Sequence, residues 1–337
     1  MLSHPSILEG AAMGAAELTK PLPVGLKTTK TREKVRSSQT FNKRFPSASL
    51  PHSQVTAFSN SSNSPSMASW VIVGATRGIG LEYVRQLASD SNKIIFALIR
   101  SQNTAGGLNK LAADRKNIHV IETDISSPQK LQLAVEQVSK ITGGGLGVVV
   151  YNAFLPGTAM FELPISGFVG KEAELEAELV EPNAAHGQLK VNVVHLIHSV
   201  NAFLPLVRKG SAKKLIYITS GHGVVDVSRI CEVPNLLGYC TSKAAGNIVM
   251  AKYHAELKSE GIKTLSLSPG WVDTDSGRPS STEAFDWLVA AFQKLQPDVT
   301  GPITPEQSVR LQLGVIDMLD ASQSGMILSQ NGNDTWF

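Results

Sequence analysis

The 337-residue sequence has only two cysteines, Cys231 and Cys240, too few for a disulfide framework or a four-thiolate zinc site. It also lacks any run of 18 apolar residues without a charge, so no membrane-spanning helix is expected. Its histidines and acidic residues do not fall at ligand spacing, which predicts no metal site. Scarce cysteine favours a reducing compartment, and the cytoplasm is the expected location.

Charge is scarce too, and it is unevenly distributed. Residues 1–66 carry eight Lys and Arg against three Glu, a net charge of +5, within a total of +3 for the chain. The remaining residues are therefore close to neutral, with a net charge of −2. They give no electrostatic argument for binding nucleic acid.

Residues 1–66 have no sustained hydrophobic period and are rich in Ser and Thr. Such a segment buries too little apolar surface to offset its chain entropy, and we expect it to be disordered. One interpretation is an upstream extension without function, favoured because Met67 leads straight into an apolar run, as a natural start would. The other is an organellar transit segment, since the segment is basic, Ser-rich and acid-poor.

From residue 67 to residue 337, strand-like and helical segments alternate. Short apolar runs typical of strands buried on both faces occur at 70–73, 94–99, 118–122, 148–151, 215–219, 264–267 and 326–328. Helical patterns occur at 78–89, 128–140, 183–208, 238–259 and 305–320. The alternation predicts a single α/β domain of the Rossmann type: a doubly wound, mostly parallel seven-stranded sheet with helices on both faces.

The first predicted strand leads into a glycine-rich loop, Gly74-Ala75-Thr76-Arg77-Gly78-Ile79-Gly80, which opens a helix. Gly74 permits a tight turn, Gly78 allows backbone to approach a pyrophosphate, and Gly80 lets the helix pack on the strand. The start of the helix adds N–H donors and the positive end of the helix dipole. The loop therefore predicts nucleotide binding.

Tyr239 and Lys243 stand four residues apart on a predicted helix, so their side chains share one face. An ammonium beside a phenol is expected to lower the phenol pKa and make Tyr239 a general acid. On its own this spacing more often marks a plain helix face. Ser220, which ends the fifth predicted strand at the edge where ligands bind, favours the catalytic interpretation.

Two arginines indicate which nicotinamide cofactor is used. NAD-binding proteins place an acidic residue after the second strand to hold the ribose 2′-hydroxyl, whereas an arginine accommodates a 2′-phosphate. Here the strand ends in Arg100 with no acid beside it, and Arg77 lies in the glycine-rich loop. A guanidinium suits bidentate contact with a phosphate, so NADP(H) is the expected cofactor.

The glycine loop, Asp124, Asn152-Ala153, Tyr239-Cys240-Thr241-Ser242-Lys243 and Pro269-Gly270-Trp271-Val272-Asp273-Thr274 follow one another along the chain. In this order they resemble the motifs of the short-chain dehydrogenase/reductase family over residues 67–337. Tyr151-Asn152-Ala153-Phe154 and Trp336 are most similar to its carbonyl-reductase and fungal ketoreductase branch.

The resemblance implies NADPH-dependent reduction of a ketone or aldehyde. Ser220 would hold the substrate oxygen, Tyr239 would donate the proton and Lys243 would hold the nicotinamide ribose. Asn192 would distort its helix and bind a water linking Lys243 to solvent. The implied cofactor site comprises Gly74, Thr76, Arg77, Gly78, Ile79, Gly80, Arg100, Asp124, Ile125, Asn152, Ala153, Tyr239, Lys243, Pro269, Gly270, Val272 and Thr274.

Several alternatives stay open. The same motifs serve an NADP-dependent alcohol dehydrogenase, and a nucleotide-sensing protein without catalysis is a rival of another class. An apparent insertion at 227–234 leaves open whether Ser220 or Thr219 faces the site, with Ser228 a more remote candidate. His222, two residues beyond Ser220, could line the pocket but is taken as a loop residue. Apolar residues in 276–298, a lid in this family, favour a lipophilic carbonyl substrate, and the family includes both homodimers and monomers.

Overall fold

The computed structural model describes residues 68–154, 164–180, 187–274 and 281–337, so the predicted leader lies outside the described residues. The strands of this part are β1 (Ala68–Val73), β2 (Lys93–Ile99), β3 (Ile118–Glu122), β4 (Val148–Tyr151), β5 (Lys214–Ile218), β6 (Lys263–Ser268) and β7 (Ile327–Ser329). They form one sheet of order β3-β2-β1-β4-β5-β6-β7, and every neighbouring pair is parallel. The predicted seven-stranded Rossmann-type sheet is confirmed.

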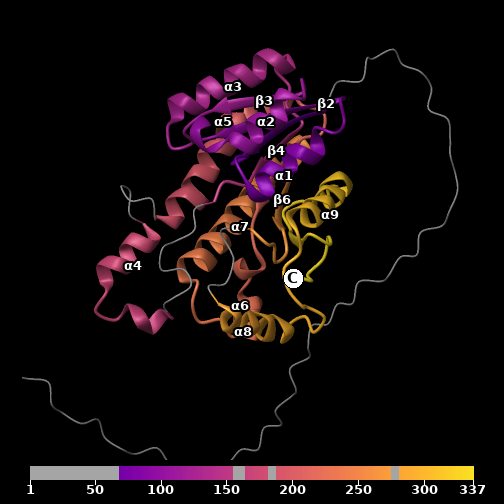
Figure 1. The fold of residues 1–337 in the computed structure, drawn as a ribbon. Coiled ribbons are helices and arrows are strands. Elements are labelled where there is room, and N and C mark those ends of the chain that lie inside the picture. The colour runs from indigo at the N-terminus through magenta and orange to yellow at the C-terminus, as the bar shows by residue number, and fades with distance from the viewer. Residues whose placement is uncertain (1–67, 155–163, 181–186, 275–280) are drawn as a thin grey trace, which may run out of the picture. The chain divides into compact units, whose positions relative to one another are not determined.

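The helices connect successive strands and cover both faces of the sheet (Figure 1). They are α1 (Gly78–Leu87), α2 (Gly106–Ala113), α3 (Pro128–Thr142), α4 (Glu172–Leu179), α5 (His195–Lys209), α6 (Val225–Cys231), α7 (Leu237–Leu257), α8 (Thr282–Gln293) and α9 (Pro305–Met318). Short 3₁₀ turns occur at Gln102–Thr104, Ile165–Phe168, Gly221–Gly223 and Lys258–Glu260. The predicted helices are therefore present, with ends that shift by a few residues.

The core has two halves, one on each face of the sheet. Alternate residues of β1 enter different halves, because successive side chains of a strand point to opposite faces. Val71 and Val73 pack with residues of α3, α5 and α7, whereas Trp70 and Ile72 pack with residues of α1, α2 and α9. Burial on both faces explains why the strands appear in the sequence as unbroken apolar runs.

The strand order reverses between β1 and β4, since β1 is followed in the chain by β2 on one side and later by β4 on the other. At such a switch point the two loops that leave the carboxyl ends of the strands run in opposite directions. Open α/β sheets bind their ligands in the crevice this creates. The topology thus places a ligand site beside the loop that follows β1.

The long helix predicted at 183–208 differs from expectation at its start. Lys190–Val194 forms a π-helical segment, and α5 continues from His195, while residues 181–186 lie outside the described residues. A π turn accommodates one extra residue and therefore widens the helix locally. The distortion falls around Asn192, where the family resemblance places it.

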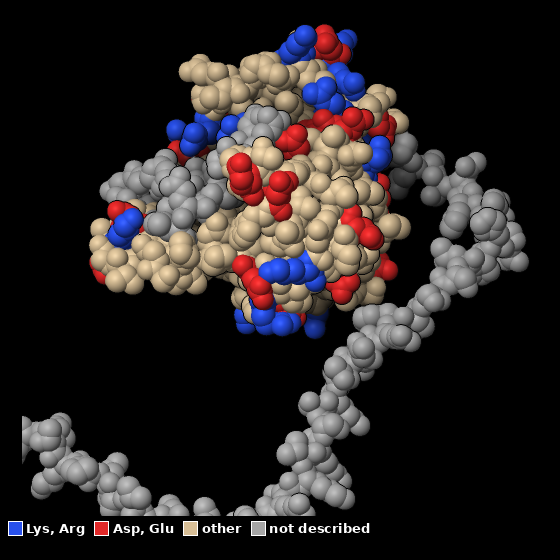
Figure 2. Space-filling view, turned by 60° about the horizontal axis from the view of Figure 1, so that its bottom comes forward, with Lys and Arg blue, Asp and Glu red and all other residues tan. Residues whose placement is uncertain are grey.

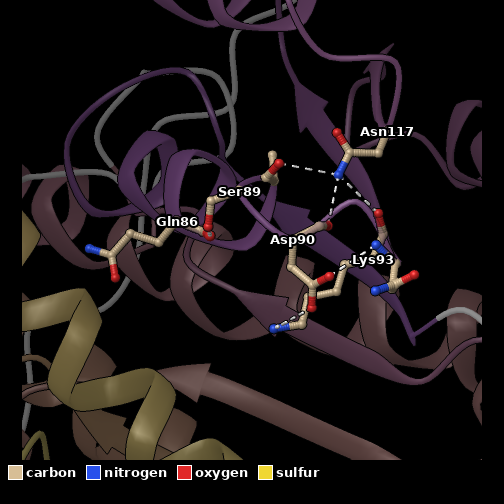
Figure 3. A network of polar contacts seen from close by, with 7 residues as sticks. Gln86, Ser89, Asp90, Lys93 and Asn117 are labelled. Atoms are coloured by element: carbon tan, nitrogen blue, oxygen red, sulfur yellow. Dashed lines mark hydrogen bonds and ion pairs between the residues drawn. The ribbon is translucent and has the colours of Figure 1, made fainter.

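The side-chain amide of Asn117 holds the turn between α1 and β2 (Figure 3). Asn117 Nδ2 donates to the carbonyl oxygens of Ala88, Asp90 and Lys93 at 3.3, 3.1 and 3.1 Å. The Lys93 ammonium also lies 3.7 Å from a carboxylate oxygen of Asp90. These contacts fix the end of α1 to the start of β2, and so fix the helix that the glycine-rich loop begins.

Lys and Arg side chains lie among Asp and Glu side chains on the face shown in Figure 2, with no field of one sign. Among the described residues, one helix, Lys190–Lys209, is long and apolar enough to cross a membrane by composition alone. Half of its most apolar window is buried inside the fold, where it packs on the sheet. Core helices of this kind meet the same criterion, so the finding is weak evidence for a membrane span.

Candidate active site

A cleft of about 940 Å³ lies where β1 to β6 end. It is lined by residues that follow each of these strands, together with residues of α7, α8 and the segment 336–337. All of the expected cofactor residues except Gly80 line the cleft, and Ser220 also does, whereas Asn192 does not. The motifs that are scattered along the sequence are therefore brought together at one edge of the sheet.

The glycine-rich loop presents backbone to the cleft. Gly74 and Gly78 have φ angles of +86° and +55°, which L side chains rarely adopt. A Cβ on Gly74 would come within 2.7 Å of the Ala153 backbone. Among the described residues no side chain caps α1, so its first-turn N–H groups suit a phosphate. The loop and the size of the cleft fit a dinucleotide.

Gly80 does not line the cleft, although the implied cofactor site includes it, but it has the packing role that the sequence predicts. It is buried beneath the loop, where a Cβ would lie 2.0 Å from the Gly74 carbonyl oxygen and 2.6 Å from Asn152 Nδ2. Asn152 Nδ2 in turn donates to the Gly74 carbonyl oxygen at 2.8 Å. Gly80 therefore lets helix and strand approach, and Asn152 shapes the loop.

Tyr239 projects from the first turn of α7 toward the end of β5. Its hydroxyl is hydrogen-bonded to the Ser220 side chain, and Ser220 Oγ also accepts from the His222 backbone N–H at 3.2 Å. Burial raises the pKa of Tyr239 to about 12, while the Ser220 hydrogen bond opposes this rise. The expected lowering of the phenol pKa by Lys243 is thus wrong for this geometry, because burial outweighs other influences.

The same geometry decides between the three hydroxyl candidates. Ser220 lines the cleft and contacts Tyr239. Thr219 is buried with no hydrogen-bond partner for its hydroxyl among the described residues, and it does not line the cleft. Ser228, on α6, is hydrogen-bonded to the Cys240 side chain. Of the three, only Ser220 is placed to share a ligand oxygen with Tyr239.

Lys243 lies one turn further along α7 and is buried. Its Nζ donates to the carbonyl oxygen of Ile218 at 2.8 Å and lies 5.9 Å from the centre of the Tyr239 ring. The rings of Phe154 and Tyr217 lie at 5.1 and 5.0 Å from Nζ. Burial lowers the pKa of Lys243 to about 7, so the side chain is only partly charged at neutral pH. Its influence on the pKa of Tyr239 is correspondingly weak.

Asn192 supports α7 from behind rather than lining the cleft. Its Nδ2 donates to Ser242 Oγ at 3.0 Å, and Ser242 Oγ donates to the Tyr239 carbonyl oxygen at 2.9 Å. The neighbouring Val191 carbonyl, freed in the π segment, accepts from the Tyr151 hydroxyl at 2.6 Å. The π-helical segment is therefore linked to the turn of α7 that carries Tyr239.

The segment after β6 closes one side of the cleft. The Pro269 carbonyl accepts from Ser308 Oγ at 2.6 Å, and Gly270 has a φ of +84° with a would-be Cβ 2.8 Å from the Gln330 amide. Val272 forms a bridge with Ile303, and the Thr274 methyl lies 3.6 Å from the position of a Gly78 Cβ. The segment thus faces the glycine-rich loop across the cleft.

Arg77 and Arg100 are exposed and line the opposite end of the cleft, with Asp124. Asp124 accepts from the Ser126 N–H and hydroxyl at 2.9 and 2.7 Å, and these bonds lower its pKa. Glu122, which no motif singles out, accepts from the Gln102 N–H at 3.0 Å through its carboxylate, near the end of β2. It comes from the neighbouring strand, so position along the chain gave no signal of it.

Aromatic side chains form the other end of the cleft, and most of them lie in segments that the sequence had already indicated. Phe154, Trp271, Phe292, Trp336 and Phe337 line it with Leu236 and Leu288. His222 lies among them, which corrects its interpretation as an ordinary loop residue. These residues come from several separate elements, so only the fold reveals the group.

Two further chemistries find no support among the described residues. No group of three or more His, Cys, Asp or Glu is placed to hold a metal ion in this part of the chain. Cys240, next to Tyr239, has a thiol whose pKa burial raises to about 11, so it is protonated at neutral pH.

The chain is similar to known proteins over the region that carries these motifs. Residues 69–284 match the family described as short chain dehydrogenase. The short-chain dehydrogenase/reductase atnB of Arthrinium sp is 47% identical over 272 residues, which cover 80% of this chain and 100% of that protein. AacuF of Aspergillus aculeatus, of the same description, is 38% identical over 275 residues with the same coverage.

Solved structures show the same fold. The NADPH-bound carbonyl reductase from chicken fatty liver superposes with a TM-score of 0.63 at 24% identity, covering 79% of this chain and 98% of that one. The carbonyl reductase Sniffer of D. melanogaster gives 0.61 at 23% identity, with the same coverage. At these identities the likeness establishes the architecture alone.

Proposed function

The chain belongs to the short-chain dehydrogenase family of nicotinamide-dependent oxidoreductases, and on this premise we propose that it reduces a ketone or aldehyde to an alcohol with NADPH. The observation that carries the proposal is the contact between Ser220 and Tyr239 in the cleft, with Lys243 one turn away. Carbonyl reductases of the same fold, one of them bound to NADPH, support the substrate class and the cofactor.

The chain's residues supply position and a proton. The reduced nicotinamide, when bound, supplies the hydride. Ser220 and Tyr239, already in contact, would both donate hydrogen bonds to the carbonyl oxygen and stabilise the charge that develops on it. Tyr239 would then transfer its phenolic proton to that oxygen, and the alcohol would leave. Asn192 would hold Tyr239 in place through Ser242.

The cofactor would lie along the cleft from the two arginines to Tyr239. The loop backbone around Gly74 and Gly78 would hold the pyrophosphate, and Lys243 the nicotinamide ribose. Arg77 and Arg100, both exposed at the end of the cleft, would hold a 2′-phosphate, which is the ground for preferring NADPH. Val272 and Thr274, facing the glycine-rich loop, would contact the carboxamide.

The reaction is reversible, and reduction uses the protonated form of Tyr239. With a pKa of about 12 the phenol keeps its proton at neutral pH, as a proton donor must. Oxidation of an alcohol requires the phenolate as a base. The NADP-dependent alcohol dehydrogenase therefore ranks second, and a nucleotide sensor third, because a sensor has no use for a proton donor.

The test is NADPH consumption with a panel of ketones and aldehydes, followed by identification of the product. We expect turnover with at least one carbonyl compound and little activity with NADH. Turnover only with alcohols and NADP⁺ would favour the dehydrogenase. Tight binding of NADPH without turnover across a broad panel would favour the sensor and overturn the proposal.

The location in the cell is a separate proposal. Scarce cysteine favours the cytoplasm, and a basic leader of the kind found before residue 67 is the ground for the organellar alternative. Imaging the full-length chain with a fluorescent protein attached decides between them. Import into an organelle would support the transit interpretation of residues 1–66.

A further inference from the structure

The His222 imidazole lies at the aromatic end of the cleft, and one of its nitrogens has no hydrogen-bond partner among the described residues. Its Nδ1 is buried, and no described residue forms a hydrogen bond with it. Burial lowers the pKa of His222 to about 4, so the ring is neutral at pH 7 and has one donor and one acceptor nitrogen. A buried polar atom without a partner costs free energy, which a ligand can recover by supplying one.

Hydrogen bonds and close packing fix the backbone that carries the imidazole. The His222 N–H donates to Ser220 Oγ at 3.2 Å, and the next turn is closed by the Gly221 N–H donating to Ser268 Oγ at 3.0 Å. A Cβ on Gly221 would lie 2.7 Å from Trp336, so tryptophan packs directly on this turn. The imidazole is therefore preorganised two residues from Ser220.

Flat rings surround the imidazole. Phe292, Phe337 and Tyr239 lie at 5.5, 6.1 and 6.3 Å between ring centres. Phe292 and Phe337 stack at 4.0 Å with planes 10° apart, and Trp271 meets Phe292 edge-on at 5.0 Å. Rings fixed in this way offer faces and edges to another aromatic ring.

The arginine and aspartate side chains of the cleft lie at its other end. Among its described lining residues, Arg77, Arg100 and Asp124 follow β1, β2 and β3, on the far side of the switch point from β6. No Asp, Glu or Arg side chain of the described residues lines the aromatic end, and the nearby Lys243 ammonium donates to the Ile218 carbonyl oxygen. It is therefore suited to a neutral ring bearing a polar substituent, rather than to an acid or a phosphate ester.

Building on the proposed function, we propose that the substrate is a neutral aromatic ketone or aldehyde with a hydroxyl group on its ring, which forms a hydrogen bond with His222. The ring lies among Phe292, Trp336 and Phe337 while the carbonyl reaches Ser220 and Tyr239. The ring centres of His222 and Tyr239 are 6.3 Å apart, so one small molecule spans both groups.

The test uses acetophenone, its 2-, 3- and 4-hydroxy isomers and cyclohexyl methyl ketone. The isomers place the hydroxyl at different distances from the carbonyl, and the last compound replaces the flat ring by a puckered one. His222→Phe removes both nitrogens but keeps a ring, whereas His222→Gln keeps a donor and an acceptor. His198→Phe is the matched control, because His198 Nδ1 is also buried without a partner among described residues but lies off the cleft.

We expect the wild type to favour at least one hydroxy isomer over acetophenone by roughly tenfold in kcat/KM, the effect of one hydrogen bond. His222→Phe should reduce this preference to less than about threefold, mainly through KM, while His222→Gln keeps part of it. His198→Phe should keep the full preference. Acetophenone should be favoured over cyclohexyl methyl ketone by the wild type.

A wild type without preference for any hydroxy isomer, or an unchanged preference in His222→Phe, would overturn the assignment. Equal kcat/KM values for acetophenone and cyclohexyl methyl ketone would overturn the proposal that the substrate ring is aromatic. If none of the ketones is reduced, the dissociation constants of the same compounds, measured calorimetrically with NADP⁺ present, replace kcat/KM. A hydroxyl preference in binding that His222→Phe abolishes would then support the His222 site while the proposed reduction fails. Binding without that preference would overturn the site.

Discussion

Lys243 Nζ donates a 2.8 Å hydrogen bond to the carbonyl oxygen of Ile218, the last residue of β5. The bond joins α7 to the strand that leads into Ser220, so the proton donor and its partner hydroxyl share one anchor. The anchor is a buried cation, only 4% exposed. Burying a charge opposes folding, so the anchor should make stability depend on pH.

Lys243→Met should make the free energy of unfolding less dependent on pH. The pKa of Lys243 is about 7 in the folded protein against 10.5 for the free side chain, so between these values the unfolded chain binds more protons. The free energy of unfolding therefore rises with pH across this window because of Lys243. Methionine cannot titrate, so the wild type should gain stability relative to the variant between pH 7 and pH 10.

The measurement is denaturant unfolding of both proteins at several pH values in this window. Lys252→Met, at an exposed position of the same helix, controls for the loss of a lysine. Parallel curves for the wild type and Lys243→Met would show that the buried side chain does not titrate in this range.

Tyr239→Phe should abolish most of the reductase activity. The substitution removes the proton donor but keeps the ring, and general acid catalysis contributes roughly 10²–10⁴-fold to rate. NADPH affinity should change little. Tyr253→Phe is the matched control, since this tyrosine lies on the same helix but bonds Asn201 at 2.7 Å, away from the cleft. A Tyr239→Phe variant within threefold of the wild-type kcat would contradict the assignment.

Substitution by alanine should have opposite effects on stability at two helical glycines. A Cβ on Gly246 would lie 2.5 Å from the Tyr217 ring, which flanks Lys243, so Gly246→Ala should destabilise the protein by about 1–3 kcal/mol. Gly314, on α9, has no atom within 4 Å of its would-be Cβ, so Gly314→Ala should stabilise it by about 0.5–1 kcal/mol. Thermal unfolding of both variants is the measurement, and a gain in stability for Gly246→Ala would contradict the packing.

Arg100→Asp should weaken NADPH binding more than NADH binding. A carboxylate repels a 2′-phosphate but accepts from a 2′-hydroxyl. Loss of one charge-assisted hydrogen bond costs about 1.5–3 kcal/mol, or roughly 10- to 150-fold in affinity. Arg310→Asp, exposed on α9 and outside the cleft lining, is the control. An unchanged ratio of the two dissociation constants would mean that Arg77 binds the 2′-phosphate instead, or that neither arginine does.

A chain starting at Met67 should keep its activity and stability. The match to the family begins at residue 69, and every residue placed in the cleft follows it. We expect kcat/KM within tenfold of the full-length value and a thermal midpoint within about 5 °C. A larger fall in either quantity would mean that residues 1–66 stabilise the catalytic domain.

The sheet was largely predictable because each strand is a short apolar run buried on both faces. For instance, the run predicted at 148–151 is β4 itself, and 215–219 is displaced by one residue. Helix ends were harder to place. The π segment around Asn192 followed from the family resemblance, since hydrophobic periodicity carries no sign of one extra residue in a turn.

The sequence predicted the site residues whose motifs follow strands. It did not predict the properties that depend on burial, such as a pKa or a contact between distant segments. Spacing places Tyr239 and Lys243 on one face of a helix, but it does not show that the phenol is buried enough to raise its pKa. Phe292 and Phe337 meet His222 only because α8 and the segment after β7 fold over the same cleft. Contacts between such distant segments leave no local pattern in the sequence.

The distribution of the four tryptophans has a practical consequence. Trp70 is buried in the core and Trp287 is 44% exposed on α8, while Trp271 and Trp336 line the cleft. Two of the chain's four indoles thus line the cleft, where a bound reduced nicotinamide would absorb their fluorescence. The protein therefore carries an intrinsic optical signal of occupancy, and binding can be followed without a label or turnover.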